Sequence, residues 1–523
     1  PLAKTRISWI DKNQVFIASD FGKDSMTTSG YPRIIKVWQR GQKLAEAKTI
    51  FTADKNSVGT NAYRVKLKKG RKVNIISESI SFWKYKVYLL ENEKLLQLKV
   101  PSTANIAGRY LGKFVLALKQ DWQIAGHHFV QGEIVLADLD FLSTGNGEIE
   151  SIIKPNKQMV VENVVTSKKG LFITTLQDVK AGLYRYKKLK DNSWQIEKIE
   201  FPDNGALNVV DVDAKTGNLF VTYESFITPP SLYFVSGKSL KTKILKQQKA
   251  TFDGKQFKVE QYFATSKDGT KVPYFVVMNK NTQFNGQNPT HIFSYGGFRN
   301  TLTPSYSGSY EALSGAYGKL WLERGGVFVL ANIRGGGEYG PAWHQAALKQ
   351  NRPRVYEDFE AVAQDLFTRK ITSKQHLGIE GRSNGGLLVT ATMVRHPELY
   401  NAVICGAPLI DMKRYNKLLA GASWMGEYGN PDIPEQWQYI KTYSPYQNIK
   451  ANVKYPAIFF YTSTQDDRVH PAHARKMAAK MLEYGDEVDY YENTEGGHHG
   501  FSTNEQLAHR LALSYTHLWN HLR

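Results

Sequence analysis

The sequence predicts two domains of different class: an all-β propeller over residues 1–250 and an α/β domain over residues 251–523. Two observations support this division. The first half repeats a strand-like pattern at a nearly constant step, and the second half alternates short apolar strands with helical patterns. A chain of 523 residues is also long enough to build two substantial cores.

The composition is that of a globular protein and excludes several classes. Hydrophobic residues make up 41% of the chain, and no apolar run approaches the roughly 20 residues that span a bilayer. We therefore expect no membrane insertion. A single cysteine, Cys405, excludes an intrachain disulfide and a thiolate metal cluster, and no metal or organic cofactor is expected. The chain begins PLAKTRISWI without a signal peptide, so a cytoplasmic and a periplasmic location both stay open, as does the oligomeric state.

The net charge of +20 is distributed unevenly. Residues 1–250 hold 39 Lys and Arg against 23 Asp and Glu, whereas residues 251–523 hold 29 against 25. A basic half is compatible with nucleic-acid binding, but its lysines, such as Lys66 and Lys187, are scattered and carry no nucleic-acid-binding signature. We interpret them as a solvated basic surface and expect no nucleic-acid partner.

A short strand-like run occurs five times in the first half. In each run an apolar residue is followed by a large one, and the pairs begin at Val37, Val87, Val135, Leu183 and Leu232, which are 50, 48, 48 and 49 residues apart. Another apolar run precedes each of the last three pairs: FVLALK, LFITTL and LFVTYE. Turn residues separate the runs. This spacing is typical of four-stranded propeller blades, with an irregular all-β domain as the alternative.

The character of the sequence changes near residue 250. Residues 257–280 indicate a hairpin with Asp268-Gly269 at its turn. The strand candidates HIFSYGG, GGVFVLANI, LGIEGRS and AIFFYTS then alternate with helical stretches such as YEDFEAVAQDLFTRK and HARKMAAKMLEY. This alternation predicts a doubly wound, mostly parallel sheet, whose functional residues lie on loops at the carboxyl ends of its strands.

The stretch GRSNGG, residues 381–386, places a serine between glycines on either side. Alone this pattern is weak in a chain with 42 glycines, but it follows the strand LGIE and opens the helical run GLLVTATMVRHPELY. Strand, turn and helix in this order predict the nucleophile elbow of an α/β-hydrolase. Gly381 and Gly385 allow neighbouring backbones to approach closely. The turn exposes the Ser383 hydroxyl and lets the Asn384 N–H point at a developing oxyanion.

A serine nucleophile needs a base and a group that orients the base, and in α/β-hydrolases these follow in the order Ser, acid, His. The strand AIFFYTS leads into a loop with Asp466 and Asp467, and the strand VDYYEN leads into a loop with His498 and His499. We interpret Asp466 as the orienting acid and His498 as the base for Ser383. Each residue alone has an ordinary explanation, as a turn residue, helix cap or solvated loop side chain. Their order and placement together favour catalysis.

These motifs resemble the prolyl oligopeptidase family of serine peptidases, in which a propeller caps an α/β-hydrolase domain. The matching stretches, between about residues 260 and 500, are SKDGTKVP, YGGF, ANIRGGGEYG, WH, GRSNGGLL, DDRV and EGGH. The resemblance implies a serine endopeptidase that hydrolyses short proline-containing peptides on the carboxyl side of proline through an acyl-enzyme. It also favours Asp466 over Asp467 and His498 over His499.

The resemblance further implies roles for the residues around the serine. Tyr295 matches the tyrosine whose hydroxyl joins the Asn384 N–H in the oxyanion hole. Trp424 matches the ring that stacks on the substrate proline, and Arg468 matches the arginine that binds a carbonyl of the preceding residue. The remaining matched pocket residues are Phe298, Tyr428 and Val469. A flat indole suits a pyrrolidine ring, and an arginine offers a fixed fork of donors. Core packing for Trp424 and a salt bridge for Arg468 are the alternatives.

Other functions stay open at this point. Oligopeptidase B-like peptidases cleave after Lys or Arg and need acidic pocket side chains, which the matched positions do not provide. An esterase on the same fold needs neither the propeller nor Arg468, and a binding module with a decayed hydrolase domain would not need an intact triad. The chain differs from the family at its N-terminus. Family members usually begin with a further segment, which is followed by a propeller of seven blades. We expect a chain without that segment and about two blades, either as a fragment or as a naturally short variant.

Overall fold

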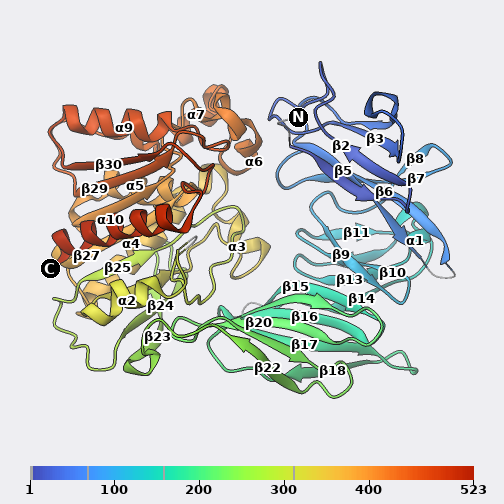
Figure 1. The fold of residues 1–523 in the computed structure, drawn as a ribbon, viewed down its shortest axis with the longest axis horizontal. Helices are drawn as coiled ribbons and strands as arrows, with labels where there is room; N and C mark the ends of the chain where they lie inside the picture. The colour runs from blue at the N-terminus through green and yellow to red at the C-terminus, as the bar shows by residue number, and fades with distance from the viewer. Residues whose placement is uncertain (1–3, 68–69, 157–158, 310–311) are drawn as a thin grey trace.

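In the computed structural model, a β-rich N-terminal part lies beside an α/β C-terminal part (Figure 1). The structure describes residues 4–67, 70–156, 159–309 and 312–523. The predicted fold class, a propeller followed by an α/β-hydrolase domain, is confirmed. None of the helices within the described ranges is long and apolar enough to cross a membrane.

Five four-stranded antiparallel blades follow one another along the described part of the N-terminal half. The first two blades consist of β1 (Arg6–Trp9), β2 (Gln14–Ala18), β3 (Ile34–Gln39), β4 (Lys48–Thr52), β5 (Gly59–Lys66), β6 (Lys72–Ser79), β7 (Tyr85–Glu91) and β8 (Lys94–Gln97). The third consists of β9 (Asn105–Tyr110), β10 (Lys113–Ala117), β13 (Ile134–Ala137) and β14 (Ile149–Ile153), with the hairpin β11 (Trp122–Ile124) and β12 (His127–Phe129) and the helix α1 (Leu139–Thr144) inserted. The last two consist of β15 (Met159–Ser167), β16 (Gly170–Gln177), β17 (Lys180–Lys188), β18 (Trp194–Ile199), β19 (Ala206–Val212), β20 (Leu219–Glu224), β21 (Ser231–Val235) and β22 (Thr242–Gln247).

The recurring sequence pairs all lie in the third strand of a blade, in β3, β7, β13, β17 and β21. The apolar runs ahead of the last three pairs start at the first or second residue of the blade's second strand, in β10, β16 and β20. Alternate side chains of the inner strands pack between neighbouring blades. Ile75 in β6 of the second blade and Leu116 in β10 of the third are fully buried in one shared cluster. Burying such a side chain stabilises the fold by about 1.5–3 kcal/mol. The repeat therefore reflects the packing of one blade on the next.

The C-terminal half is built on one eight-stranded sheet with the strand order β23-β24-β26-β25-β27-β28-β29-β30. Its strands are β23 (Phe257–Thr265), β24 (Lys271–Asn279), β25 (Thr290–Phe293), β26 (Val327–Ala331), β27 (Leu377–Arg382), β28 (Ala402–Gly406), β29 (Ala457–Ser463) and β30 (Val488–Asn493). The hairpin β23–β24 and the β24–β26 pair are antiparallel, and the other pairs are parallel. The carboxyl ends of β25, β27, β29 and β30 therefore meet at one edge, where a site in such a sheet is expected.

Helices cover both faces of this sheet (Figure 1). One core cluster holds α4 (Pro353–Thr368), α5 (Asn384–Arg395) and α9 (Ala472–Glu483) against the sheet, and the other holds α2 (Ala316–Leu320) and α10 (Asn504–Leu522). In α4 the buried residues Val355, Phe359, Val362 and Leu366 recur at helical spacing. The shorter helices are α3 (Pro341–Gln345), α6 (Met425–Tyr428), α7 (Pro434–Ile440) and α8 (Pro445–Asn448).

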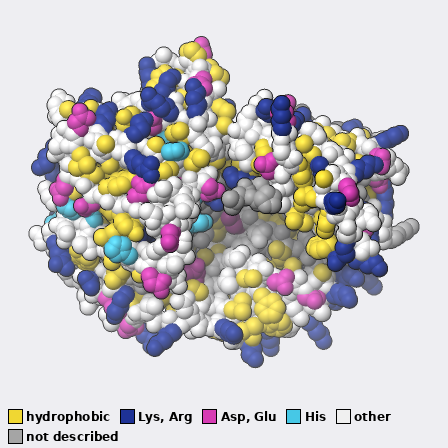
Figure 2. Space-filling model, turned by 45° about the horizontal axis from the view of Figure 1, so that its top comes forward, with side chains coloured by type: hydrophobic (Ala, Val, Ile, Leu, Met, Phe, Trp, Pro, Cys, Tyr) yellow, Lys and Arg dark blue, Asp and Glu magenta, His cyan; other side chains and the backbone are white. Residues whose placement is uncertain are grey.

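The surface is hollowed between the two domains, and Lys and Arg side chains lie along the outer side of the propeller (Figure 2). The excess of basic residues in the first half is thus spread over an outer surface. This arrangement agrees with the interpretation of these lysines as solvated side chains.

Candidate active site

Ser383 lies at the sharp turn between β27 and α5. Its backbone is in the left-handed region, with φ of 59°, which is strained for a residue with a side chain. The turn is held by a hydrogen bond from the Ser383 N–H to the Gly406 carbonyl, at 2.8 Å. A Cβ on Gly381 would lie 2.1 Å from the carbonyl oxygen of Gly385, so only glycine fits there. The strained turn directs the serine side chain away from the backbone, as a nucleophile elbow requires.

His498 and Asp466 form a buried pair behind the serine. The His498 Nδ1 and Asp466 Oδ2 atoms are 2.7 Å apart, and the two residues are 6% and 4% exposed. The other carboxylate oxygen accepts the backbone N–H groups of Arg468 and Val469, both at 2.9 Å. A carboxylate bound at Nδ1 leaves Nε2 of the imidazole to accept a proton. His499, in contrast, is exposed.

The electrostatic environment favours an uncharged imidazole. Burial lowers the pKa of His498, and the positive charges of Arg382 and Arg468 lower it further, while Asp466 acts in the opposite direction. The net effect is a lowered pKa. His498 therefore stays neutral, and able to accept a proton, at a lower pH than an ordinary histidine.

Two donors converge on the position beside Ser383. The Tyr295 hydroxyl, on the loop after β25, is hydrogen-bonded with the Ser383 side chain. Burial raises the pKa of Tyr295, so the phenol remains a protonated donor at neutral pH. Asn384 is the first residue of α5, where backbone N–H groups lack an intrahelical acceptor. Both groups are suited to stabilising a developing oxyanion.

A cavity of about 550 Å³ opens over Ser383. It is lined by nine of the ten predicted site residues: Tyr295, Phe298, Ser383, Asn384, Trp424, Tyr428, Arg468, Val469 and His498. The tenth, Asp466, contacts the cavity through His498. The Phe298 and Tyr428 rings meet edge to face, with centroids 5.7 Å apart, and the Arg468 side chain is exposed. The cavity thus combines apolar walls with the cationic side chains of Lys4, Arg382 and Arg468.

The propeller also contributes to this cavity, which the sequence did not indicate. Phe82, in the loop between β6 and β7, lines the cavity and packs edge to face on Phe298 with ring centroids 5.3 Å apart. Its neighbour Trp83 packs against His344 with ring centroids 4.6 Å apart. The Arg299 guanidinium lies over the Trp83 ring, with its Cζ 4.5 Å from the ring centroid. One propeller loop therefore completes a wall of the catalytic domain's pocket.

A buried carboxylate, Glu427, organises the backbone behind the pocket. It accepts the Phe298 N–H at 3.0 Å, an N–H of Arg352 at 3.1 Å and the ring nitrogen Nε2 of His344 at 2.7 Å. Burial raises the pKa of Glu427, but the interactions with His344 and Arg352 outweigh it and hold the pKa below its ordinary value. The group is therefore charged and fully partnered. Glu427 and His344 stand in the motifs GASWMGEYG and WH, but no role was predicted for either.

The Asn384 side chain extends this network to the oxyanion position. Its Oδ1 accepts hydrogen bonds from Arg352 and from the Tyr428 hydroxyl, the latter at 2.6 Å, and its Nδ2 donates to the Tyr295 carbonyl at 2.5 Å. The Asn384 side chain and the Tyr295 main chain, whose residues carry the two candidate oxyanion donors, are thus held by hydrogen bonds. Such preorganisation is the condition for effective transition-state stabilisation.

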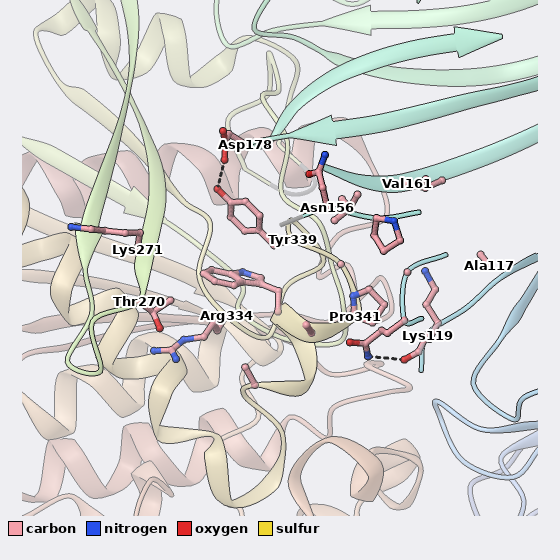
Figure 3. Close-up of a pocket in the computed structure, with 18 of the residues that line it drawn as sticks. Ala117, Lys119, Asn156, Val161, Asp178, Thr270, Lys271, Arg334, Tyr339 and Pro341 are labelled. Carbon is pink, nitrogen blue, oxygen red and sulfur yellow. Dashed lines mark hydrogen bonds between the residues drawn. The ribbon is translucent and has the colours of Figure 1, made fainter. Parts of the chain in front are cut away.

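A larger cavity, of about 1280 Å³, lies between the propeller and the catalytic domain (Figure 3). Its polar groups are largely engaged: Tyr339 donates to Asp178 at 3.0 Å, and Arg334 is bound by Asp268 and Asp358. None of the serine, histidine and aspartate described above lines it. Among the residues that the structure describes, no group of three His, Cys, Asp or Glu could hold a metal ion.

Two family descriptions match this chain. Residues 2–248 match "Prolyl oligopeptidase, N-terminal beta-propeller domain", and residues 314–523 match "Prolyl oligopeptidase family". The uncharacterized peptidase y4nA of Sinorhizobium fredii is 39% identical over 530 residues, which cover 100% of this chain and 72% of that protein. The prolyl endopeptidase of Elizabethkingia miricola is 38% identical over 318 residues, covering 61% of this chain and 44% of that protein.

Two solved structures are similar to this chain along nearly its whole length. A post-proline cleaving enzyme from Rickettsia typhi superimposes with a TM-score of 0.91 at 30% identity, over 99% of this chain and 76% of that one. Oligopeptidase B from Leishmania major superimposes with a TM-score of 0.82 at 21% identity, over 99% of this chain and 72% of that one, and shares the fold.

Proposed function

Because the chain belongs to the prolyl oligopeptidase family of serine peptidases, we propose that it hydrolyses short peptides on the carboxyl side of proline. The observation that carries this proposal is the cavity over Ser383, whose wall places Trp424, Phe298 and Tyr428 beside the nucleophile. Proline has an apolar ring and no N–H to satisfy, so apolar and aromatic contact is its main source of binding energy. Arg468, exposed in the same cavity, supplies donors for the carbonyl of the preceding residue.

In the proposed mechanism, His498 takes the proton of the Ser383 hydroxyl at Nε2 while the serine oxygen attacks the carbonyl carbon of proline. Asp466 holds the imidazole at Nδ1 and stabilises the imidazolium that forms. The negative charge that develops on the carbonyl oxygen is stabilised by the Tyr295 hydroxyl and the Asn384 N–H. Collapse of this intermediate breaks the peptide bond.

The same groups complete this cleavage and then hydrolyse the acyl-enzyme. His498 gives its proton to the leaving amine, and the acyl group remains on Ser383 as an ester. A water molecule then attacks this ester as His498 takes its proton. The second tetrahedral intermediate collapses as His498 returns that proton to the serine oxygen, which releases the acid and restores the serine hydroxyl.

A second specificity, cleavage after Lys or Arg, is favoured by one observation. Asp467 lines the same cavity and its side chain is exposed. A carboxylate there could bind a cationic side chain. It lies next to Arg468, however, whose positive charge opposes binding of a second cation. We therefore favour proline.

The test compares the p-nitroanilide substrates benzyloxycarbonyl-Gly-Pro and benzyloxycarbonyl-Gly-Arg, using the parent protein and the variant Ser383→Ala. We expect the proline substrate to be hydrolysed faster, and Ser383→Ala to reduce kcat by a factor on the order of 10⁴ or more. Ser502→Ala, which truncates an exposed serine, is the matched control and should keep the parental rate.

Labelling with diisopropyl phosphofluoridate separates the remaining outcomes. The reagent should modify Ser383 in the parent protein, as identified by peptide mass spectrometry, because it reacts with activated serines. Undiminished hydrolysis by Ser383→Ala would refute the assigned nucleophile. A preference for the arginine substrate would support the alternative specificity, and turnover of simple esters without peptides would indicate an esterase.

A further inference from the structure

Arg382, the last residue of β27, is a buried arginine directly before the nucleophile. It is 9% exposed and lines the same cavity as Ser383 and His498. Burying a guanidinium is costly unless its donors are satisfied. One Nη2 donor of Arg382 binds the main-chain carbonyl of His498. A single side chain thus connects the strand that ends at the serine with the residue that acts as its base.

The loop that carries His498 has further supports, but they act at its ends. Ser463, at the end of β29, donates to the carbonyls of Glu495 and Gly496. Asn493, at the end of β30, donates to the carbonyl of Gly500 at 3.1 Å. Arg382 instead reaches the peptide unit of the histidine itself. Its contact therefore bears directly on the position of the imidazole relative to Ser383.

The charge of Arg382 acts on the same groups. Three charged side chains change the pKa of His498. Asp466 and Arg468 come from the loop after β29, and Arg382 comes from the end of β27. Asp467 and Lys4 line the same cavity. Arg382 also partly offsets the rise that burial causes in the pKa of Tyr295, which makes that hydroxyl a stronger donor. A positive charge here therefore disfavours protonation of the base and favours charge on the oxyanion.

We propose that Arg382 is a positioning residue for the hydrolysis, whose guanidinium fixes the main chain of His498 relative to Ser383 and places a positive charge beside the reacting groups. The inference rests on the proposed roles of Ser383 and His498. Proton transfer requires the serine oxygen and the imidazole nitrogen to be within hydrogen-bond reach, and a misplacement of about 1 Å can cost about 100-fold in rate.

Two variants separate geometry from charge. Arg382→Met keeps an unbranched side chain but removes the guanidinium with its donors and charge, and Arg382→Lys keeps the charge without the planar fork. With benzyloxycarbonyl-Gly-Pro p-nitroanilide, we expect Arg382→Met to lower kcat about 100-fold and to change KM less than about threefold. Arg382→Lys should also lose most of kcat. Thermal melting of each variant checks that the fold is kept.

The pH profile gives a readout that a purely structural role would not change. Activity requires neutral His498, so it falls as the pH drops through the pKa of this group. Loss of a nearby positive charge makes protonation easier and raises that pKa. The acid limb of kcat/KM should therefore shift to higher pH in Arg382→Met, and by less in Arg382→Lys.

Chemical rescue completes the test. In Arg382→Ala, added methylguanidinium chloride should restore part of kcat, because the vacated space opens to the cavity. Methylammonium chloride at the same concentration is the control and should restore less.

Parental kinetics in Arg382→Met would overturn the inference, as would a loss of kcat with an unshifted acid limb and no rescue. Undiminished hydrolysis by Ser383→Ala would overturn the proposed role of Ser383 and this inference together, whereas parental kinetics in Arg382→Met alone would overturn only the inference.

Discussion

On the proposed function, different side chains around Ser383 carry out the hydrolysis and select the substrate. His498 and Asp466 are assigned to the hydrolysis, and both are held by contacts inside the catalytic domain. Trp424 and Arg468 line the cavity and make no described hydrogen bond to this pair through their side chains. On the proposed function, specificity can therefore be changed at Trp424 with little effect on the reacting groups.

Truncation of Trp424 should remove the preference for proline. Loss of a ring contact in an apolar pocket costs about 1–3 kcal/mol, or 10–200-fold in kcat/KM. We expect Trp424→Ala to lower kcat/KM by this factor for benzyloxycarbonyl-Gly-Pro p-nitroanilide but by much less for the corresponding alanine substrate. The measured quantity is the ratio of the two values. Trp437→Ala, which removes a half-buried indole packed under Lys413, is the control. A ratio that Trp424→Ala leaves unchanged would rule out the stacking role.

Among the elements, the β27–α5 turn is tightly constrained by close backbone contacts. A Cβ on Gly381 would lie 2.1 Å from the Gly385 oxygen and 2.4 Å from its carbonyl carbon, whereas a Cβ on Gly426 would meet Trp83 at an ordinary 3.5 Å. The clash at Gly381 involves backbone on both sides, so no side chain can move to relieve it.

We accordingly expect Gly381→Ala to destabilise the protein by about 3 kcal/mol or more, which is above the usual cost of overpacking. Displacement of the turn should also lower kcat by about 100-fold or more, because Ser383 moves with it. Gly426→Ala is the matched control and should melt within a few degrees of the parent. Differential scanning calorimetry and the peptide assay check both effects. A Gly381→Ala variant with parental melting and activity would show that the turn is less rigid than its contacts indicate.

The elements that could be predicted are those with a local sequence pattern. The five blades followed from a repeat that falls on their third strands, and β27 and α5 followed from the motif that joins them. β28 was not predicted, although its five residues are all buried, as are those of the predicted strand β29. α10 was not predicted either, although its apolar residues recur at helical spacing.

The site residues likewise include some that the sequence predicted and others that it did not. The order of Ser383, Asp466 and His498 along the chain was sufficient to suggest their pairing, and the His498–Asp466 contact is present. The contacts of Phe82, Glu427 and Arg382 were not predicted. Phe82 belongs to the other domain, and the partners of Glu427 and Arg382 lie far away in sequence. Such contacts depend on tertiary packing, which leaves no periodic signal.

At the scale of the whole molecule, the propeller shapes the pocket of the other domain. The loop between β6 and β7 packs Phe82 on Phe298 and Trp83 on His344. His344 in turn binds Glu427, which accepts the Phe298 N–H. A chain of direct contacts therefore runs from the second blade to the pocket wall. Ser383 and His498 take no part in these contacts, and the branch that leads from Glu427 to Asn384 runs through Arg352, further from Trp83. We therefore expect the loop to influence substrate binding more than the chemical step.

Trp83→Ala tests this coupling between the domains. The change removes the packing on His344 and a cation–π contact with Arg299 of about 0.5–2 kcal/mol, so the Phe298 wall should loosen. We expect KM for the proline substrate to rise about five- to tenfold while kcat changes less than about threefold, because uniform binding is lost. Trp9→Ala removes a propeller tryptophan that is 63% exposed and should leave both constants unchanged. Equal effects of the two variants, or a fall in kcat without a change in KM, would contradict the coupling, because the direct contacts of Trp83 are with residues of the pocket wall and its support.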